Sequence, residues 1–354
     1  MKFENQENQL KIIVEPLLKW YEENKRTLPW RMDQEPYHVW ISEIMLQQTR
    51  VEAVKEYYKR FLKALPKISD LENVEEETLM KLWEGLGYYN RARNLKKAAH
   101  MIMEEYNGMF PDTYEEIKKL SGIGEYTAGA IASICYNLPV PAVDGNVLRV
   151  ISRVLESYDN IDDVKTKQKI RELLKSIYPK NSCGEFTQSL MELGAILCKP
   201  NGVPNCEICP IAMCCKAYQN HVTANIPIRN EKKPRRHEDM TVFILKKGDK
   251  YAVRKRKKQG LLAGLWEFPN LSGKLKEQEA VSVISEWQMK PKDLEKVIEY
   301  RHIFTHVEWD MKAYYIECED MALEHKDLKW VSAEEMNQTI TLPSAFKTFW
   351  EAAL

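Results

Sequence analysis

The 354-residue sequence has no excess of charge of either sign, no N-terminal signal pattern and no long apolar run. Its 52 basic residues balance 52 acidic ones. This balance counts mildly against a nucleic-acid binder, so any such binding must depend on local clusters of charge. The missing apolar run excludes a membrane-spanning helix, and the missing signal pattern favours the cytoplasm. We therefore expect a cytoplasmic protein without a membrane partner.

Cysteine is scarce outside one short stretch. Five of the eight cysteines lie between residues 198 and 215. In a reducing compartment, such a cluster indicates metal ligands or reactive thiols before disulfides. Four thiolates with the spacing C-x7-C-x2-C-x5-C can hold an iron-sulfur cluster, and zinc is the alternative. The ligand set that fits this spacing is Cys198, Cys206, Cys209 and Cys215, with Cys214 a second candidate for the last position.

Two glycines open the most informative stretch of the chain, residues 120–149. Gly122 and Gly124 precede a run of small and apolar residues that predicts a buried helix. Glycine permits close approach of the backbone, and the free N–H groups of a helix N-terminus attract anions, so this turn is a candidate phosphate clamp. Asp144 precedes a second periodic apolar run and is the predicted cap of that helix. Each feature taken alone is more often an ordinary turn or cap.

Apolar spacing predicts further helices over residues 9–24, two between residues 37 and 61, and two between residues 161 and 197. Glu43 lies among apolar residues of the second region. Burial would raise the pKa of its carboxyl group and let it hold a proton near neutral pH, as a general acid requires; a solvated Glu is the commoner outcome for a helix.

Gly85 and Gly87 predict a turn before a tyrosine pair and a basic series, which suits stacking and phosphate contact or simply a solvated helix face.

Together these motifs resemble the helix-hairpin-helix DNA glycosylases, and in particular the MutY family of adenine DNA glycosylases. The resemblance is carried by LSGIGEYTAGAI, VDGNVLRV, EIMLQQTRV, LPWR and the cysteine cluster. Tyr126 stands where lyase-type relatives such as endonuclease III have a lysine that forms a Schiff base. The sequence departs from the family pattern at Ser121, where proline is common, and in the cysteine loop, which is one residue longer than C-x6-C-x2-C-x5-C.

The resemblance implies a role for each matching residue. Glu43 would protonate a flipped adenine, Asp144 would stabilise the oxocarbenium-like sugar, and Tyr126 and Asn146 would orient sugar, carboxylate and water. The adenine pocket would be lined by Arg26, Trp30, Arg31 and Gln188. Further DNA contacts would come from Gly122, Gly124, Gln48 as a wedge for the flipped base and Tyr88 beside the opposite base. The four matching cysteines would hold a structural four-iron four-sulfur cluster.

The last third of the chain changes to a strand-like pattern. A polar, basic, proline-containing segment, residues 221–238, is typical of a linker. Beyond it, TVFILKKGDKYAVRKR predicts two strands joined by a Gly-Asp turn, IFTHVEWDMKAYYIEC predicts a strand or a strand pair, and KWVSAEEMNQ predicts a strand end and a helix. GLLAGLWEFP resembles the Nudix-related C-terminal domain of the same family, but the carboxylates of a catalytic Nudix box are missing. Phe304, Thr305 and His306 match the family's Phe-Ser-His loop that recognises 8-oxoguanine, with Thr in place of Ser.

We therefore expect a mainly α helix-hairpin-helix glycosylase domain with an iron-sulfur loop over residues 1–220, a linker over 221–238, and an α+β Nudix-like domain over 239–354. The expected activity is hydrolysis of the N-glycosidic bond of adenine opposite 8-oxoguanine or guanine in double-stranded DNA, by a monomeric, monofunctional, bacterial-type repair enzyme associated with the nucleoid. One alternative is an endonuclease III-type glycosylase and lyase, which Tyr126 disfavours. The other is a non-catalytic iron-sulfur protein that senses DNA damage, which Glu43 and Asp144 disfavour.

Overall fold

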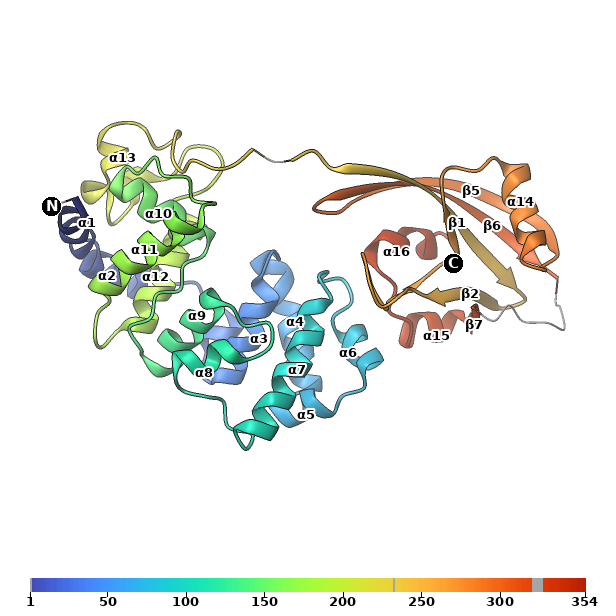
Figure 1. The fold of residues 1–354 in the computed structure, drawn as a ribbon, viewed down its shortest axis with the longest axis horizontal. Helices are drawn as coiled ribbons and strands as arrows, with labels where there is room; N and C mark the ends of the chain where they lie inside the picture. Colours follow the sequence, from blue (N-terminus) through green and yellow to red (C-terminus); the bar gives the residue numbers. More distant parts are fainter. Residues whose placement is uncertain (1, 232, 320–326) are drawn as a thin grey trace. The chain divides into compact units, whose positions relative to one another are not determined.

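The computed structural model describes residues 2–231, 233–319 and 327–354, which form two compact units (Figure 1). The first unit consists of Met1–Asn73 and Arg93–Glu231, and the second of Val74–Ala92 and Lys232–Leu354. The second unit thus includes a segment from within the predicted first domain. In the described part of the chain, no helix is long and apolar enough to cross a membrane.

The first unit is helical. Its α-helices are α1 (Lys2–Lys11), α2 (Val14–Asn24), α3 (Pro36–Leu46), α4 (Val51–Ala64), α5 (Ile68–Asn73), α7 (Asn90–Glu105, beginning in the other unit's segment), α8 (Tyr114–Lys119), α9 (Glu125–Tyr136), α10 (Gly145–Leu155), α11 (Val164–Ile177), α12 (Cys183–Ile196) and α13 (Lys216–Gln219). Short 3-10 turns lie at η1 (Pro29–Arg31), η2 (Cys206–Ile208) and η3 (Ala212–Cys214). The paired helices predicted over residues 37–61 and 161–197 are confirmed.

The single helix predicted over residues 9–24 is wrong, because the structure has two helices there. α1 ends at Lys11 and α2 begins at Val14. Pro16 lies in the first turn of α2, where a residue without a backbone N–H is tolerated. In one continuous helix, residue 16 would have to donate an N–H to the carbonyl of Ile12, and proline has none. Apolar residues of both helices nevertheless face one core, in which Leu10, Ile13 and Leu17 are fully buried.

Helix α12 is central to the first unit, since it packs on α2, α9 and α10. Its close approach to α10 depends on Gly194: a Cβ atom at that position would lie 2.5 Å from the Cβ of Asn146. At the turn before α9, Gly122 has φ of +77°, which favours glycine, and a side chain there would also meet Asn94. Gly194 thus lets α12 lie close to the start of α10, and Gly122 lets the turn before α9 lie close to α7.

The second unit is a mixed sheet with helices on both faces (Figure 1). Its described strands are β1 (Arg236–Lys247), β2 (Lys250–Lys255), β3 (Trp266–Glu267), β4 (Asn270–Ser272), β5 (Pro291–Ile303), β6 (Val307–Cys318) and β7 (Lys329–Ser332). Its helices are α6 (Glu76–Leu82), α14 (Glu277–Glu286), α15 (Ala333–Gln338) and α16 (Ser344–Glu351). The main strand order is β3-β2-β1-β6-β5, with β1 parallel to β6; β4 pairs with β1 and β7 with β2.

Alternation along the strands divides the core of this unit into two layers. On β1, Val242 and Ile244 face a cluster with α15 and α16, while Phe243 and Leu245 face a cluster with α14. The Gly-Asp turn between β1 and β2 is confirmed, with Lys247 opposite Lys250. Of the strand or strand pair predicted over IFTHVEWDMKAYYIEC, the structure has the single strand β6, whose antiparallel partner β5 comes almost entirely from residues before that segment. β1 begins at Arg236, earlier than the sequence pattern predicts, because its first residues pair with β6.

Candidate active site

A cavity of about 380 Å³ lies in the first unit, bounded by η1, α3, α9, the start of α10 and α12. All four predicted catalytic residues line it: Glu43, Tyr126, Asp144 and Asn146. All four predicted adenine contacts line it as well: Arg26, Trp30, Arg31 and Gln188. Gln48 also lines it. Segments from residue 26 to residue 195 therefore converge on one space. Most of a small ligand's surface would be buried in such a cavity.

Glu43 lies in the middle of α3 and is 6% exposed. Burial, with a smaller contribution from the Asp144 carboxylate, raises the pKa of Glu43 to about 7; the hydrogen bond from Tyr126 and the charge of Arg31 oppose the rise. Tyr126 Oη donates that bond to Glu43 Oε2 over 2.6 Å. The expected burial of Glu43 is confirmed, and its carboxyl group is suited to exchange a proton near neutral pH.

Asp144 caps helix α10, as predicted. Its Oδ1 accepts from the backbone N–H of Val147 at 2.8 Å, and its Oδ2 accepts from Asn146 Nδ2 at 2.7 Å. Burial raises the pKa of Asp144, while these two donors and the charge of Arg149 act in the opposite direction. The donors oppose that rise, so the cavity holds two buried carboxyl groups with different hydrogen-bond partners.

Arg149 extends this network to the cysteine loop, a connection that sequence reasoning missed. Its Nη2 donates to Asn146 Oδ1 and to the carbonyl of Gly194, each at 2.9 Å, and its Nε donates to the carbonyl of Cys198 at 2.8 Å. Arg149 is 7% exposed. The amide that bonds Asp144 is thereby fixed from two sides.

Glu192 was also missed, although it is buried beside the cavity. It accepts hydrogen bonds from Arg26 and Arg31, with its side chain 1% exposed. Burial alone would raise the pKa of Glu192, but the hydrogen bonds from the two guanidinium groups outweigh it and lower the pKa to about 2. Its position one helical turn after Gln188, on the same face of α12, was the available signal.

The predicted cysteine ligands converge on a separate small cavity of about 20 Å³, lined among others by Cys198, Cys206, Cys209 and Cys215. Cys214 is not among the residues that line this cavity. Among the described residues, no three of the cysteine sulfurs lie within 4.8 Å of one another. The four thiols present have the chemistry to hold either an iron-sulfur cluster or a zinc ion.

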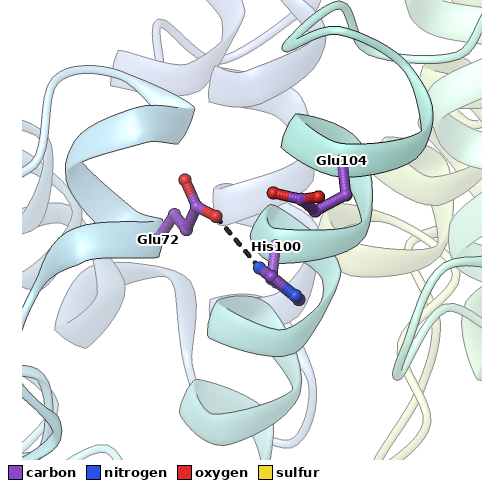
Figure 2. A group of neighbouring side chains, drawn as sticks. All are labelled: Glu72, His100 and Glu104. Atoms are coloured by element: carbon purple, nitrogen blue, oxygen red, sulfur yellow. Dashed lines mark hydrogen bonds and ion pairs between the residues drawn. The ribbon is translucent and has the colours of Figure 1, made fainter.

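One group of side chains outside both cavities has the residue types of metal ligands but lies at the protein surface. Glu72 on α5 and His100 and Glu104 on α7 point their polar atoms together (Figure 2). His100 Nδ1 bonds Glu72 Oε1 at 3.0 Å, and His100 and Glu104 are exposed. A surface ion pair between two helices accounts for this cluster.

The predicted DNA-contacting residues occur in both units. Gln48 and Tyr88 have φ of 59° and 46°, a left-handed conformation uncommon for residues other than glycine. In the second unit, Tyr88 is exposed and its hydroxyl bonds that of Thr305. Thr305 and His306 are exposed at the β5–β6 turn, while Phe304 packs on Trp309 with ring centres 4.8 Å apart. The sequence placed these residues in a recognition loop, and the hairpin presents two of them to solvent.

Two family models match the chain: the HhH-GPD superfamily base excision DNA repair protein over residues 41–180 and the NUDIX domain over residues 241–352. The adenine DNA glycosylase of Arabidopsis thaliana is 40% identical over 305 residues, which cover 75% of this chain and 48% of that protein, so the chain spans about half its length. The adenine DNA glycosylase of Buchnera aphidicola subsp. Acyrthosiphon pisum is 36% identical over 296 residues, covering 83% of each. A solved structure of endonuclease III trapped covalently on DNA is 25% identical with a TM-score of 0.53, covering 61% of this chain and 98% of that one.

Proposed function

The chain belongs to the adenine DNA glycosylases, enzymes of base excision repair, and we propose that it removes adenine opposite 8-oxoguanine or guanine without cutting the strand. The observation that carries the proposal is the pairing of Glu43 and Asp144 in one cavity. The two carboxyl groups have different surroundings, because Glu43 is buried against a phenol and Asp144 accepts two N–H donors. Such a difference assigns one group to acid chemistry and the other to charge stabilisation.

Adenine extruded from the duplex enters the cavity that Trp30, Gln188 and Glu43 line. Glu43 gives its proton to a ring nitrogen, so the base leaves with the electron pair of the glycosidic bond and needs no negative charge. The sugar becomes an oxocarbenium-like cation, which the Asp144 carboxylate stabilises. Water then adds to the anomeric carbon and loses a proton, which restores the acid.

Tyr126 supports a monofunctional reaction. The related endonuclease III structure is of a covalent intermediate with DNA, and an imine link between protein and sugar needs an amine. Tyr126 offers a phenol whose pKa is raised well above its ordinary value by burial and by the neighbouring carboxylates. A neutral phenol can hold the acid in place but cannot form an imine. The abasic product therefore keeps an intact strand.

Recognition of the opposite base belongs to the second unit and to the turn at Tyr88. Thr305 offers a hydroxyl that can donate or accept, and its contact with Tyr88 places an aromatic ring beside it. 8-Oxoguanine differs from guanine by an added carbonyl and an N7 hydrogen, so a hydroxyl at that edge can distinguish the two. The turn of Gly122 and Gly124 at the start of α9 supplies N–H groups for a DNA phosphate.

We assign Cys198, Cys206, Cys209 and Cys215 to a four-iron four-sulfur cluster with a structural role. When bound, the cluster ties the loop after α12 to α13 through four thiolates. Arg153 Nη1 donates to Cys198 Sγ at 3.2 Å, a contact that suits a sulfur bearing negative charge. The resemblance of the cysteine loop to the family pattern favours the cluster over zinc.

The test is a base-release assay on duplexes with adenine opposite 8-oxoguanine, guanine or thymine. We expect free adenine from the first two, fastest with 8-oxoguanine, and an intact strand. Release of an oxidised pyrimidine with strand cleavage would favour the endonuclease III-type alternative. DNA binding without base release would favour a damage sensor.

A further inference from the structure

The carboxylate of Glu192 is the shared acceptor of two guanidinium groups at the cavity wall. Arg26 donates to it from Nε at 2.7 Å, from Nη2 at 2.8 Å and from its backbone N–H at 3.1 Å, and Arg31 donates from Nη2 at 2.9 Å. The side chain of Glu192 is 1% exposed, against 34% for Arg26 and 15% for Arg31. Both oxygens of the carboxylate thus accept hydrogen bonds from guanidinium groups.

The buried carboxylate of Glu192 fixes the positions of its two arginine partners and compensates part of their charge. Burying an ion is costly unless it is paired, and removing one member of such a cluster leaves an uncompensated charge. Here two cations share one anion, so the cluster carries one net positive charge beside the cavity. Arg31 also hydrogen-bonds the backbone carbonyl of Arg26 at 3.3 Å, which ties both side chains to the same turn.

We propose that Glu192 is a positioning residue for adenine excision, which holds Arg26 and Arg31 at the pocket wall and cancels one of the two positive charges of that pair. The proposal rests on the proposed function, because Glu43 is the acid of that reaction. It adds a residue outside the family motifs described above and gives it an effect on proton transfer that can be measured.

Four groups surround the proton of Glu43. α9 contributes Tyr126 and Cys135, the start of α10 contributes Asp144, and η1 contributes Arg31. Arg31 is the cation of this set, and it lowers the pKa of Glu43. Changing Glu192 to Gln keeps the shape of the side chain but removes the charge that offsets Arg31 and Arg26. The pKa of Glu43 should then fall, so that its carboxyl group loses its proton at a lower pH than in the wild type.

The experiment measures single-turnover adenine release against pH by the full-length protein with its metal content intact. We expect Glu192→Gln to slow release at pH 7 by at least about tenfold. The alkaline limb of its profile should move to lower pH by at least about half a unit. Glu192→Asp keeps the charge and should leave the limb close to its wild-type position. Glu185→Gln, an exposed change on the same helix, is the matched control and should behave like wild type.

A charge-matched double variant keeps the test decisive if the single one folds poorly. Arg26→Gln with Glu192→Gln restores the wild-type net charge of the cluster, so its alkaline limb should return towards the wild-type pH even though binding is weaker. A slower rate with an unmoved limb in Glu192→Gln would mean that Glu192 only supports the fold, and would overturn the proposal. So would a limb that stays shifted in the double variant. A wild-type protein that releases no adenine would instead refute the proposed function, and this inference with it.

Discussion

The phenol of Tyr126 donates a 2.6 Å hydrogen bond to the carboxyl group of Glu43 inside the cavity. The bond joins α9 to α3 and engages Oε2, so the second carboxyl oxygen stays available for a proton directed at the base. It also explains a substitution within the wider fold: a phenol in place of an amine gives up imine chemistry and gains a neutral donor that orients the acid. The predictions below follow from this arrangement.

Removing either carboxyl function should abolish most catalysis and leave the fold intact. Glu43→Gln loses the transferable proton and Asp144→Asn loses the stabilising charge, so each should slow single-turnover adenine release by at least roughly a hundredfold. Duplex binding, followed by gel shift, should survive because neither residue contacts phosphate in this account. Wild-type release by either variant would refute the role given to that residue.

The wild-type protein should leave the abasic strand uncut until alkali is added. Without an amine at position 126 it lacks the nucleophile for an imine. Borohydride should therefore trap little protein on DNA, at the level of a Tyr126→Phe control. Trapping as efficient as that of a lyase would show that another residue attacks the sugar and that the reaction is bifunctional.

Cysteine substitutions should separate the ligands from their neighbour. Cys209 lines the small cavity with the other three predicted ligands, whereas Cys214 does not line it. Cys209→Ser should lose iron, acid-labile sulfide and the brown colour, and Cys214→Ser should retain all three. Wild-type protein purified anaerobically from iron-replete cells with stoichiometric zinc instead would contradict the cluster assignment.

The hydroxyl of Thr305 should contribute part of the preference for 8-oxoguanine over guanine. A single hydrogen bond is worth about 1 kcal/mol net, which corresponds to roughly fivefold in rate or affinity. Thr305→Val removes the hydroxyl with little change of shape and should reduce the preference by about that factor. Thr305→Ser keeps the hydroxyl and serves as the control. An equal preference in all three proteins would place discrimination elsewhere, with Tyr88 and Gln48 the first candidates.

The local features of the site could be predicted from the sequence, because each has a local physical cause. An Asp before an apolar helix predicts the cap at Asp144, and a Glu within an apolar helix predicts the burial of Glu43 once that helix lies in the core. The turn and hairpin of the second unit follow in the same way from Gly248 and from strand alternation.

The long-range features could not be predicted. Glu192 and its arginine partners are 161 and 166 residues apart, and no local pattern specifies which charges meet across such a separation. The same holds for Arg149, whose partners lie on two other segments. The grouping of residues 74–92 with the second unit depends on contacts such as Lys81 Nζ to the carbonyl of Ile340 at 2.8 Å, which sequence order gives no reason to expect.

In the proposed reaction, Glu43 delivers a proton to adenine. The decisive measurement is the pH dependence of adenine release at limiting substrate, because this rate reports the pKa values of groups in the free enzyme. Glu43 must be protonated to act and its pKa is raised to about 7. The rate should therefore be high below pH 7 and fall about tenfold per unit above it, and this limb should disappear in Glu43→Gln. A wild-type profile that stays flat from about pH 6 to 9, or the same limb persisting in Glu43→Gln, would contradict it.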